Sequence, residues 1–319
     1  MSDLTPKTDA YLPAPYPDDE IDLKELFMVL WGGKWLISAV TGLAAAISVV
    51  VALSLPNIYT ASALLAPAES SGGGLSGLMK QYGGLASLAG VSLPGGEEET
   101  RAQLGMQLMK SRVFIGNFVE RHDILPELMA IEGWDWEKDE LSFDEDDYLV
   151  DSGVWVRDVD PPFKSQPSLL EAHEEFIDIL AVSENKKTGY VTVSIDHQSP
   201  VIAAQWVNWL VEDVNAAVKA QDVAEAEKSI EYLKQQVANT SLADLQVMFF
   251  ELIQSQTETV MLAEVRSEYV FKTIDPAVIP EEKSKPSRAL ICVLGTLLGG
   301  MLGVVIVLIR HYARSEPDS

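Results

Sequence analysis

Histidines and cysteines build most metal and nucleophilic sites, so their spacing is a first test for chemistry in this chain. His122, His173, His197 and His311 lie far apart, and none has a second His or Cys at metal-ligand spacing. The single cysteine, Cys292, falls inside an uncharged apolar run. We interpret the histidines as surface or packed residues. We expect no metal site, no cofactor and no catalytic residue.

The sequence lacks the known motifs for phosphate binding and offers no defined pair of residues for carbohydrate cleavage. A Walker loop requires Gly-Lys-Ser/Thr, whereas Lys80 stands between Met79 and Gln81 in the glycine-rich segment 69–96. No Rossmann glycine fingerprint follows a predicted strand. Acidic residues are so abundant that any pair chosen for glycoside hydrolysis would be arbitrary. The sequence therefore predicts a protein that is not an enzyme.

An acidic run at residues 135–151 holds nine acids and one lysine. It lacks the central glycine and the spaced terminal glutamate of a calcium loop, so we expect a solvated loop. Three tryptophans lie in or near this run. Such rings either fill a core or stack on the faces of sugars, and the sequence leaves both open. They are Trp134, Trp136 and Trp155.

Two apolar runs, residues 35–55 and 289–309, each contain 21 residues without a charge, which is enough for a helix to cross a bilayer. Lys24 and Lys34 precede the first run, and no basic residue follows it until Lys80. This asymmetry predicts a cytoplasmic tail at 1–34 and a large extracytoplasmic loop at 56–288. The second tail, 310–319, is then cytoplasmic. Within the first tail, 1–20 has the composition of a disordered arm, and 21–31 is amphipathic.

The loop at 56–288 carries 18 Lys and Arg against 39 Asp and Glu, a net charge of about −21. Such a surface repels phosphates, so nucleic acid is not an expected partner. The loop has no cysteine and cannot use disulfides. Its stability must come from packing or from assembly.

Alternation and β-branched residues predict strands at 58–66, 189–195 and 269–274, and we expect the first and last to pair. A helix is predicted at 97–120, with Leu104, Leu108, Val113 and Phe118 as its apolar positions. Residues 201–275 contain neither Gly nor Pro, so a very long helix, or two in series joined near 239–241, follows the cap Ser199-Pro200. Ser241 and Asp244 resemble a capping box at the joint. A continuous rod of this length would reach on the order of 100 Å.

Two sets of residues are candidates for a role at the membrane. In the second run, Gly295, Gly299 and Gly303 form small-xxx-small repeats that allow close helix approach. Their partner is either another subunit or the first span, through Gly42, Ala45 and Ala46. Before this run stand Pro276, Pro280 and Pro286, which we expect to stiffen the link so that motion of the loop domain reaches the membrane helix.

Several segments together resemble the Wzz chain-length determinant proteins of O-antigen synthesis, which are polysaccharide co-polymerases. The likeness covers about residues 21–310, and the proline motif departs from the common pattern at Lys283, where many relatives have another proline. The motifs are IDLKEL at 21–26, LSLPNIY at 53–59, GGLASLAG at 83–90, SRVF at 111–114 and IDPAVIP at 274–280.

The resemblance implies an α+β inner-membrane protein with two transmembrane helices, a membrane-proximal α/β base and a long extended periplasmic helix. The base would comprise about 56–200 and 268–288, and the rod about 201–267. The resemblance further implies ring-like homo-oligomers that set the modal chain length of O-antigen with the O-antigen polymerase, without catalysis. A lipid-linked polysaccharide is a possible second partner. Related capsule co-polymerases continue into a tyrosine kinase after the second span, whereas only ten residues follow it here.

Two alternatives stay open. The chain could control the length of another lipid-linked polymer, such as enterobacterial common antigen. It could instead be a two-pass sensor of an extracytoplasmic ligand, although its short cytoplasmic segments offer no output module.

Overall fold

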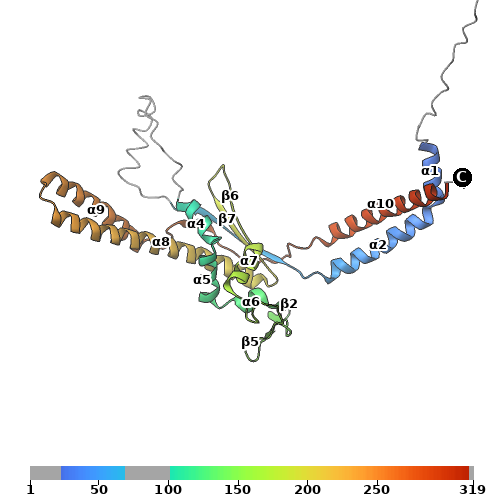
Figure 1. Ribbon diagram of the computed structural model, residues 1–319, viewed down its shortest axis with the longest axis horizontal. Helices are drawn as coiled ribbons and strands as arrows, with labels where there is room; N and C mark the ends of the chain where they lie inside the picture. Colours follow the sequence, from blue (N-terminus) through green and yellow to red (C-terminus); the bar gives the residue numbers. More distant parts are fainter. Residues whose placement is uncertain (1–22, 69–100, 316–319) are drawn as a thin grey trace, which may run out of the picture. The chain divides into compact units, whose positions relative to one another are not determined.

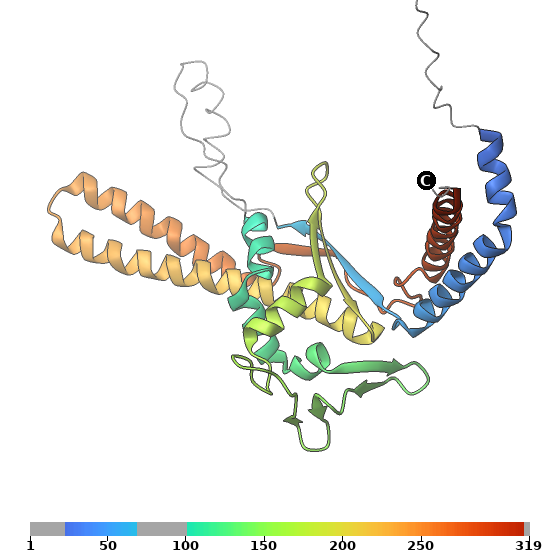
Figure 2. The ribbon, with the colours of Figure 1, turned by 45° about the vertical axis from the view of Figure 1, so that its right-hand side comes forward.

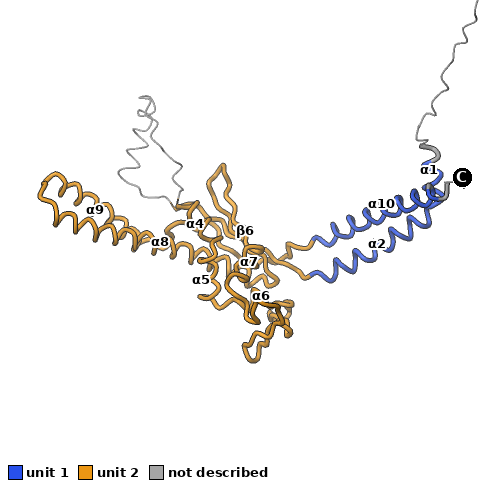
Figure 3. The backbone as a smooth tube through the Cα atoms, in the orientation of Figure 1, with its two compact units in different colours: residues 1–55, 287–319 blue, residues 56–286 orange. Residues whose placement is uncertain are grey.

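The computed structural model describes residues 23–68 and 101–315 in two compact units (Figure 1 and Figure 3). One unit comprises 1–55 and 287–319, and the other comprises 56–286. The expectations for the tail 1–20 and for the glycine-rich segment 69–96 concern residues outside those ranges.

The first unit is a pair of long apolar helices with a short helix at one end. The helices are α1 (Leu23–Gly32), α2 (Lys34–Ser54) and α10 (Arg288–Ser315). Both α2 and α10 are long and apolar enough to span a membrane, and they pack against each other. They run antiparallel, because Gly33 at the start of α2 meets Val307 near the end of α10. This is the two-span arrangement that the sequence predicts.

The second unit is organised around a four-stranded antiparallel sheet with the order β6-β7-β1-β8. The predicted pairing of the first and last strands is confirmed, because β1 lies between β7 and β8. Side chains alternate, so Ala61, Ala63 and Leu65 face the core opposite buried residues of β7. The strands are β1 (Tyr59–Pro67), β6 (Leu180–Glu184), β7 (Val191–His197) and β8 (Phe271–Asp275).

Helix α8 packs on the core face of β1 and β7, and α5 packs against α7. The predicted start of α8 is confirmed: the Ser199 hydroxyl accepts the Ile202 N–H, and Pro200 is the first helical residue. The helices are α4 (Arg101–Met109), α5 (Arg112–His122), α6 (Leu125–Met129), α7 (Leu169–Ile179), α8 (Pro200–Asn239) and α9 (Ala243–Val265).

The long helical segment differs from the expected rod. After Asn239 the chain reverses, and α9 runs back along α8 as an antiparallel hairpin (Figure 2). The joint lies where predicted, but the capping box is wrong, because α9 begins after Leu242 without a side-chain cap. Since α8 has 40 residues, the hairpin reaches at most about 60 Å rather than 100 Å.

Two further expectations need correction. The helix predicted at 97–120 is divided at Ser111, whose hydroxyl caps α5, and Val113 is 75% exposed rather than buried. The acidic run is not one loop, because it contributes to two short hairpins. These are β2 (Ile131–Asp135) with β3 (Glu140–Phe143), and β4 (Tyr148–Leu149) with β5 (Val154–Trp155).

Candidate functional site

The two ends of the second unit are joined by a backbone bridge at Ile58. The Ile58 N–H donates to the Lys285 carbonyl at 2.9 Å, and the Ile58 carbonyl accepts the N–H groups of Ser284 and Lys285 at 2.8 and 3.2 Å. We call residues 57–60, 196 and 283–286 the clasp. It holds together the segments that follow the first span and precede the second.

Side chains extend the clasp to β7. The Lys285 ammonium lies 2.6 Å from one Asp196 oxygen, and the Thr60 hydroxyl donates to the other at 2.5 Å. At the outer edge, the Lys283 ammonium donates to the side-chain amide oxygen (Oδ1) of Asn57 at 3.1 Å. Because Lys285 is largely exposed, the ion pair contributes little stability, and the backbone bonds carry most of the connection.

The segment that contains Pro276, Pro280 and Pro286 is held at both ends, by Asn208 of α8 and by the clasp. Pro276 follows the last residue of β8, and the amide side chain of Asn208 pairs with both the N–H and the carbonyl of Ala277 at 3.1 Å. Pro286 follows Lys285 directly at the clasp. Between them, Pro280 is partly buried. The stiffening role of Pro276, Pro280 and Pro286 stays a prediction.

A second asparagine of α8 fixes the start of β8. The Asn215 side-chain oxygen accepts the backbone N–H groups of three consecutive residues, 269–271, at 3.1, 2.7 and 2.9 Å. Its amide donates to the Phe271 carbonyl at 3.1 Å. Asn208 and Asn215 are seven residues apart and so share one face of the helix. Sequence reasoning missed both, although polar residues beside Val207 and Val214 on an apolar face were a usable signal.

An ionic and aromatic group joins α4, α8 and the residues before β8. The Tyr269 hydroxyl donates to Asp222 at 2.8 Å, and the Arg101 guanidinium lies 3.1 Å from the same carboxylate oxygen. Burial, together with the bond to Asp222, raises the pKa of Tyr269 to about 12. The phenol therefore stays protonated and acts as a hydrogen-bond donor at physiological pH.

The glycines of the second span face α2 of the same chain. A side chain at Gly295 would collide with Ser48, one at Gly299 with Ala44, and one at Gly303 would lie 3.1 Å from the Ile37 Cα. This geometry favours packing within the chain over a subunit contact. Of the expected α2 residues, Gly42 does not face this contact, because a Cβ added there would meet no atom within 4 Å. The effect of these glycines on helix assembly stays a prediction.

Three of the four histidines occupy unrelated environments. His122 lies 3.0 Å from Asp213 and stacks on Trp209, and His173 contacts the Lys110 carbonyl at 3.0 Å. His197 is buried, which lowers its pKa from the usual 6.5, although bonds to the Glu127 and Ser199 carbonyls oppose the shift. Within residues 23–68 and 101–315, no group of three or more His, Cys, Asp or Glu side chains could hold a metal ion.

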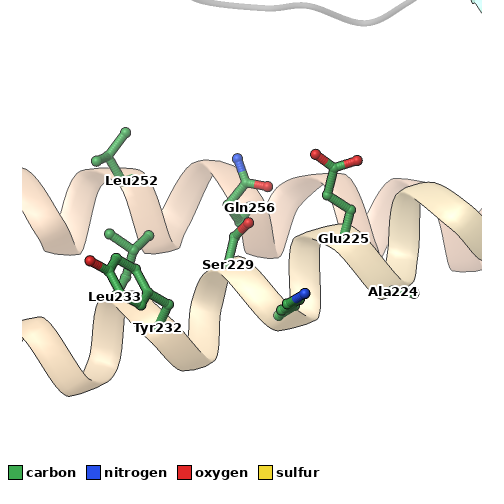
Figure 4. Close-up of a pocket in the computed structure, with 8 residues that line it drawn as sticks. Ala224, Glu225, Ser229, Tyr232, Leu233, Leu252 and Gln256 are labelled. Atoms are coloured by element: carbon green, nitrogen blue, oxygen red, sulfur yellow. The ribbon is translucent and has the colours of Figure 1, made fainter.

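The distal part of the α8–α9 hairpin has little cover. Between residues 227 and 262 no residue is buried. A shallow groove runs between the two helices, and Tyr232, Leu233 and Leu252 line it together with polar residues (Figure 4).

Two family models match the chain. The Wzz model, "Chain length determinant protein", matches residues 19–122, and the GNVR model, "G-rich domain on putative tyrosine kinase", matches residues 245–312. Together they span more than half of the chain. The protein belongs to the Wzz-type chain length determinant family of polysaccharide co-polymerases.

Solved structures with similarity include two co-polymerases. A full-length bacterial polysaccharide co-polymerase is 16% identical, with a TM-score of 0.36, over 93% of this chain and 100% of that chain. A fragment of WzzB, a polysaccharide co-polymerase from Salmonella Typhimurium, is 14% identical, with a TM-score of 0.26, over 72% of this chain and 100% of the fragment. No curated protein matches the sequence significantly.

Proposed function

We propose that this protein is a non-catalytic inner-membrane regulator that sets the modal chain length of O-antigen, acting as a homo-oligomeric scaffold beside the O-antigen polymerase. Family membership supports the role in chain length. The positions of Lys24 and Lys34 support cytoplasmic termini and a periplasmic second unit. The observation that carries the scaffold proposal is the uncovered outer face of the α8–α9 hairpin.

This outer face is a stripe along α9 that carries four exposed apolar residues and two exposed polar ones. At 100° per residue, four apolar residues fall on one side of the helix, with Gln254 and Glu258 between them. Ala263, which is buried, lies on the opposite side. The outward residues are Val247 (58% exposed), Phe250 (58%), Met261 (64%) and Val265 (86%).

A stripe of this kind is typical of a surface that another chain covers. A second copy of the same hairpin is the natural partner, because repeated contacts between identical subunits around an axis close into a ring. A ring of hairpins would then present several identical surfaces to one polymerase or one growing glycan.

The chain-length role is tested by clean deletion and complementation, with the lipopolysaccharide ladder resolved on gels. We expect deletion to spread the O-antigen length distribution without abolishing its attachment, and complementation to restore the mode. A normal ladder after deletion contradicts the proposal. If only enterobacterial common antigen changes length, the substrate assignment is wrong although the class is right.

Assembly is tested by the mass of the purified protein in nanodiscs. Phe250→Glu places a charge on the α9 stripe, and we expect a shift toward single subunits and a broadened ladder. Ser255→Glu is the matched control, because it adds the same charge on the same helix about 80° away from the stripe. Single-subunit mass for the unmodified protein would reject the scaffold.

A further inference from the structure

Three aromatic rings form a cluster in the second unit, with Trp136 exposed and Tyr59 and Trp134 half-buried. Tyr59 and Trp136 are nearly parallel, with centroids 6.4 Å apart and an interplanar angle of 26°. Trp134 packs edge-on against both rings, with centroids 5.7 Å from Tyr59 and 5.1 Å from Trp136. We call these three residues the aromatic cluster. Trp155 is not part of it, because it packs on Tyr148.

Trp136 is the exposed member of the aromatic cluster. Its side chain is 59% exposed, which is unusual for the largest apolar residue. It opens the four-residue loop between β2 and β3, just after Asp135. Two bonds fix this loop: the Glu137 N–H donates to Asp135 at 2.9 Å, and the Trp134 indole N–H donates to Asp139 at 3.1 Å. The exposed ring is therefore held in place before any ligand binds.

The surroundings of the cluster are acidic. Asp135, Glu137, Asp139 and Glu140 flank it, and Lys138 lies 3.9 Å from an Asp135 oxygen. Carboxylates accept hydrogen bonds from hydroxyl groups. An aromatic face beside several acceptors fits a pyranose, which has an apolar face of C–H groups and a rim of hydroxyl donors.

The same charges argue against two other occupants. Anionic headgroups of a bilayer would be repelled by these acids, so the cluster is a poor membrane anchor. A polysaccharide rich in uronic acids would be repelled in the same way. Neutral or amino sugars are the chemistry that the cluster accommodates.

The chain connection limits how far Tyr59 can lie from the end of the first span. Only residues 55–58 separate it from Ser54, the last residue of α2, and five extended residues span at most about 18 Å. The first sugars of a lipid-linked polymer lie just outside the bilayer. If the proposed function holds, the short connection allows the aromatic cluster to reach that part of the substrate.

We propose that the aromatic cluster Tyr59–Trp134–Trp136 is a glycan-binding site that stacks neutral or amino sugars of the lipid-linked polysaccharide. The site would hold the growing chain near the membrane while the polymerase extends it. Such retention is a physical route by which a non-catalytic protein influences length.

The test measures binding of a released glycan to the full-length protein in nanodiscs. The probe is the polysaccharide freed by mild acid from the lipopolysaccharide of the bacterium that encodes this protein. We expect Trp136→Ala to weaken binding about tenfold, as expected for the loss of one stacking contact, and Trp136→Phe to retain most of it. The control is Phe163→Ala, because Phe163 is 55% exposed in the same unit but far from the cluster in sequence.

Several outcomes would overturn this site. They are an unmodified protein that does not bind the glycan, a Trp136→Ala variant that binds normally, or equal losses in both alanine variants. A membrane location is tested with a nitroxide attached at residue 136 in a Cys292→Ser background. If the nitroxide collides more often with oxygen than with a water-soluble nickel chelate, the cluster lies in the bilayer instead. The proposed function fails separately, through an unchanged ladder after deletion.

Discussion

The two halves of α8 have similar helix-forming sequences but opposite environments. In the proximal half, residues 200–218, Trp206, Leu210 and Val214 are fully buried against the sheet. In the distal part, residues 227–239, no residue is buried, Tyr232 is 61% exposed, and α9 packs alongside. The comparison teaches that helical spacing identifies an apolar face but not what covers it. The proximal face is covered within the chain, whereas the distal hairpin keeps most of its surface exposed.

The largest expected effect comes from the proximal half. Trp206→Ala removes a fully buried ring and should lower the free energy of unfolding by about 3–5 kcal/mol. Tyr232→Ala, on the distal half of the same helix, should change it by less than about 0.5 kcal/mol. Urea titration of the purified protein in detergent measures both. Equal losses would show that the two halves are equally covered.

The next largest expected loss of stability concerns the two asparagines on the proximal part of α8, Asn215 and Asn208. Asn215→Ala leaves three buried N–H groups without their acceptor and should cost about 3 kcal/mol, again by urea titration. Asn208→Ala removes bonds to a single residue at a less buried position and should cost about 1 kcal/mol. The reverse order would mean that the link after β8, rather than its start, is the critical attachment.

A similar contrast between covered and open positions applies to the membrane helices. Gly299→Leu forces a side chain into Ala44 of α2 and should destabilise the pair by about 2 kcal/mol, measured as a lower melting temperature in detergent. Gly42→Leu points away from any neighbour and should have little effect. If Gly42→Leu instead disrupted the assembled particle, α2 would contact another subunit through that face.

The smallest expected effect is pH dependent and again lies in the core. Burial lowers the pKa of His197 below its usual 6.5, so the unfolded chain takes up the proton first as the pH falls. The stability contributed by neutral His197 is complete above pH 6.5 and is lost as the pH drops from 6.5 through the folded-state pKa. The slope is at most about 1.4 kcal/mol per pH unit.

Urea midpoints between pH 7.5 and 5.5 measure this loss. His197→Gln should flatten the profile over that interval. An unchanged slope in the variant would assign the pH dependence to other groups.

Much of the fold could be predicted from the sequence because its signals are local. The Ser199-Pro200 start of α8, strand β7 and the two uncharged spans depend on residue types and short spacing. The reversal at 240–242 depends on tertiary packing of α9 along α8, and no Gly or Pro marks it. A sequence without a breaker was therefore compatible with both a rod and a hairpin.

The candidate sites were less predictable, because they combine residues that are distant in the chain. The clasp unites Ile58 with Lys285, and the aromatic cluster unites Tyr59 with Trp136. Sequence reasoning identified Trp134 and Trp136 as possible sugar contacts but had no basis for adding Tyr59. The proline and glycine residues were visible as motifs, whereas the role of Asn215 depends on its backbone partners near β8.

The central place of β1 in the sheet has a consequence for biosynthesis. Leu65 pairs with Val191 of β7 and with Thr273 of β8. The first strand of the sheet to be translated, β1, therefore cannot complete its pairing until the last strand, β8, has been translated. The sheet cannot close until almost the whole polypeptide has been translocated. A nascent chain stopped before residue 271 would display an unpaired strand edge, the kind of surface that invites aggregation and proteolysis.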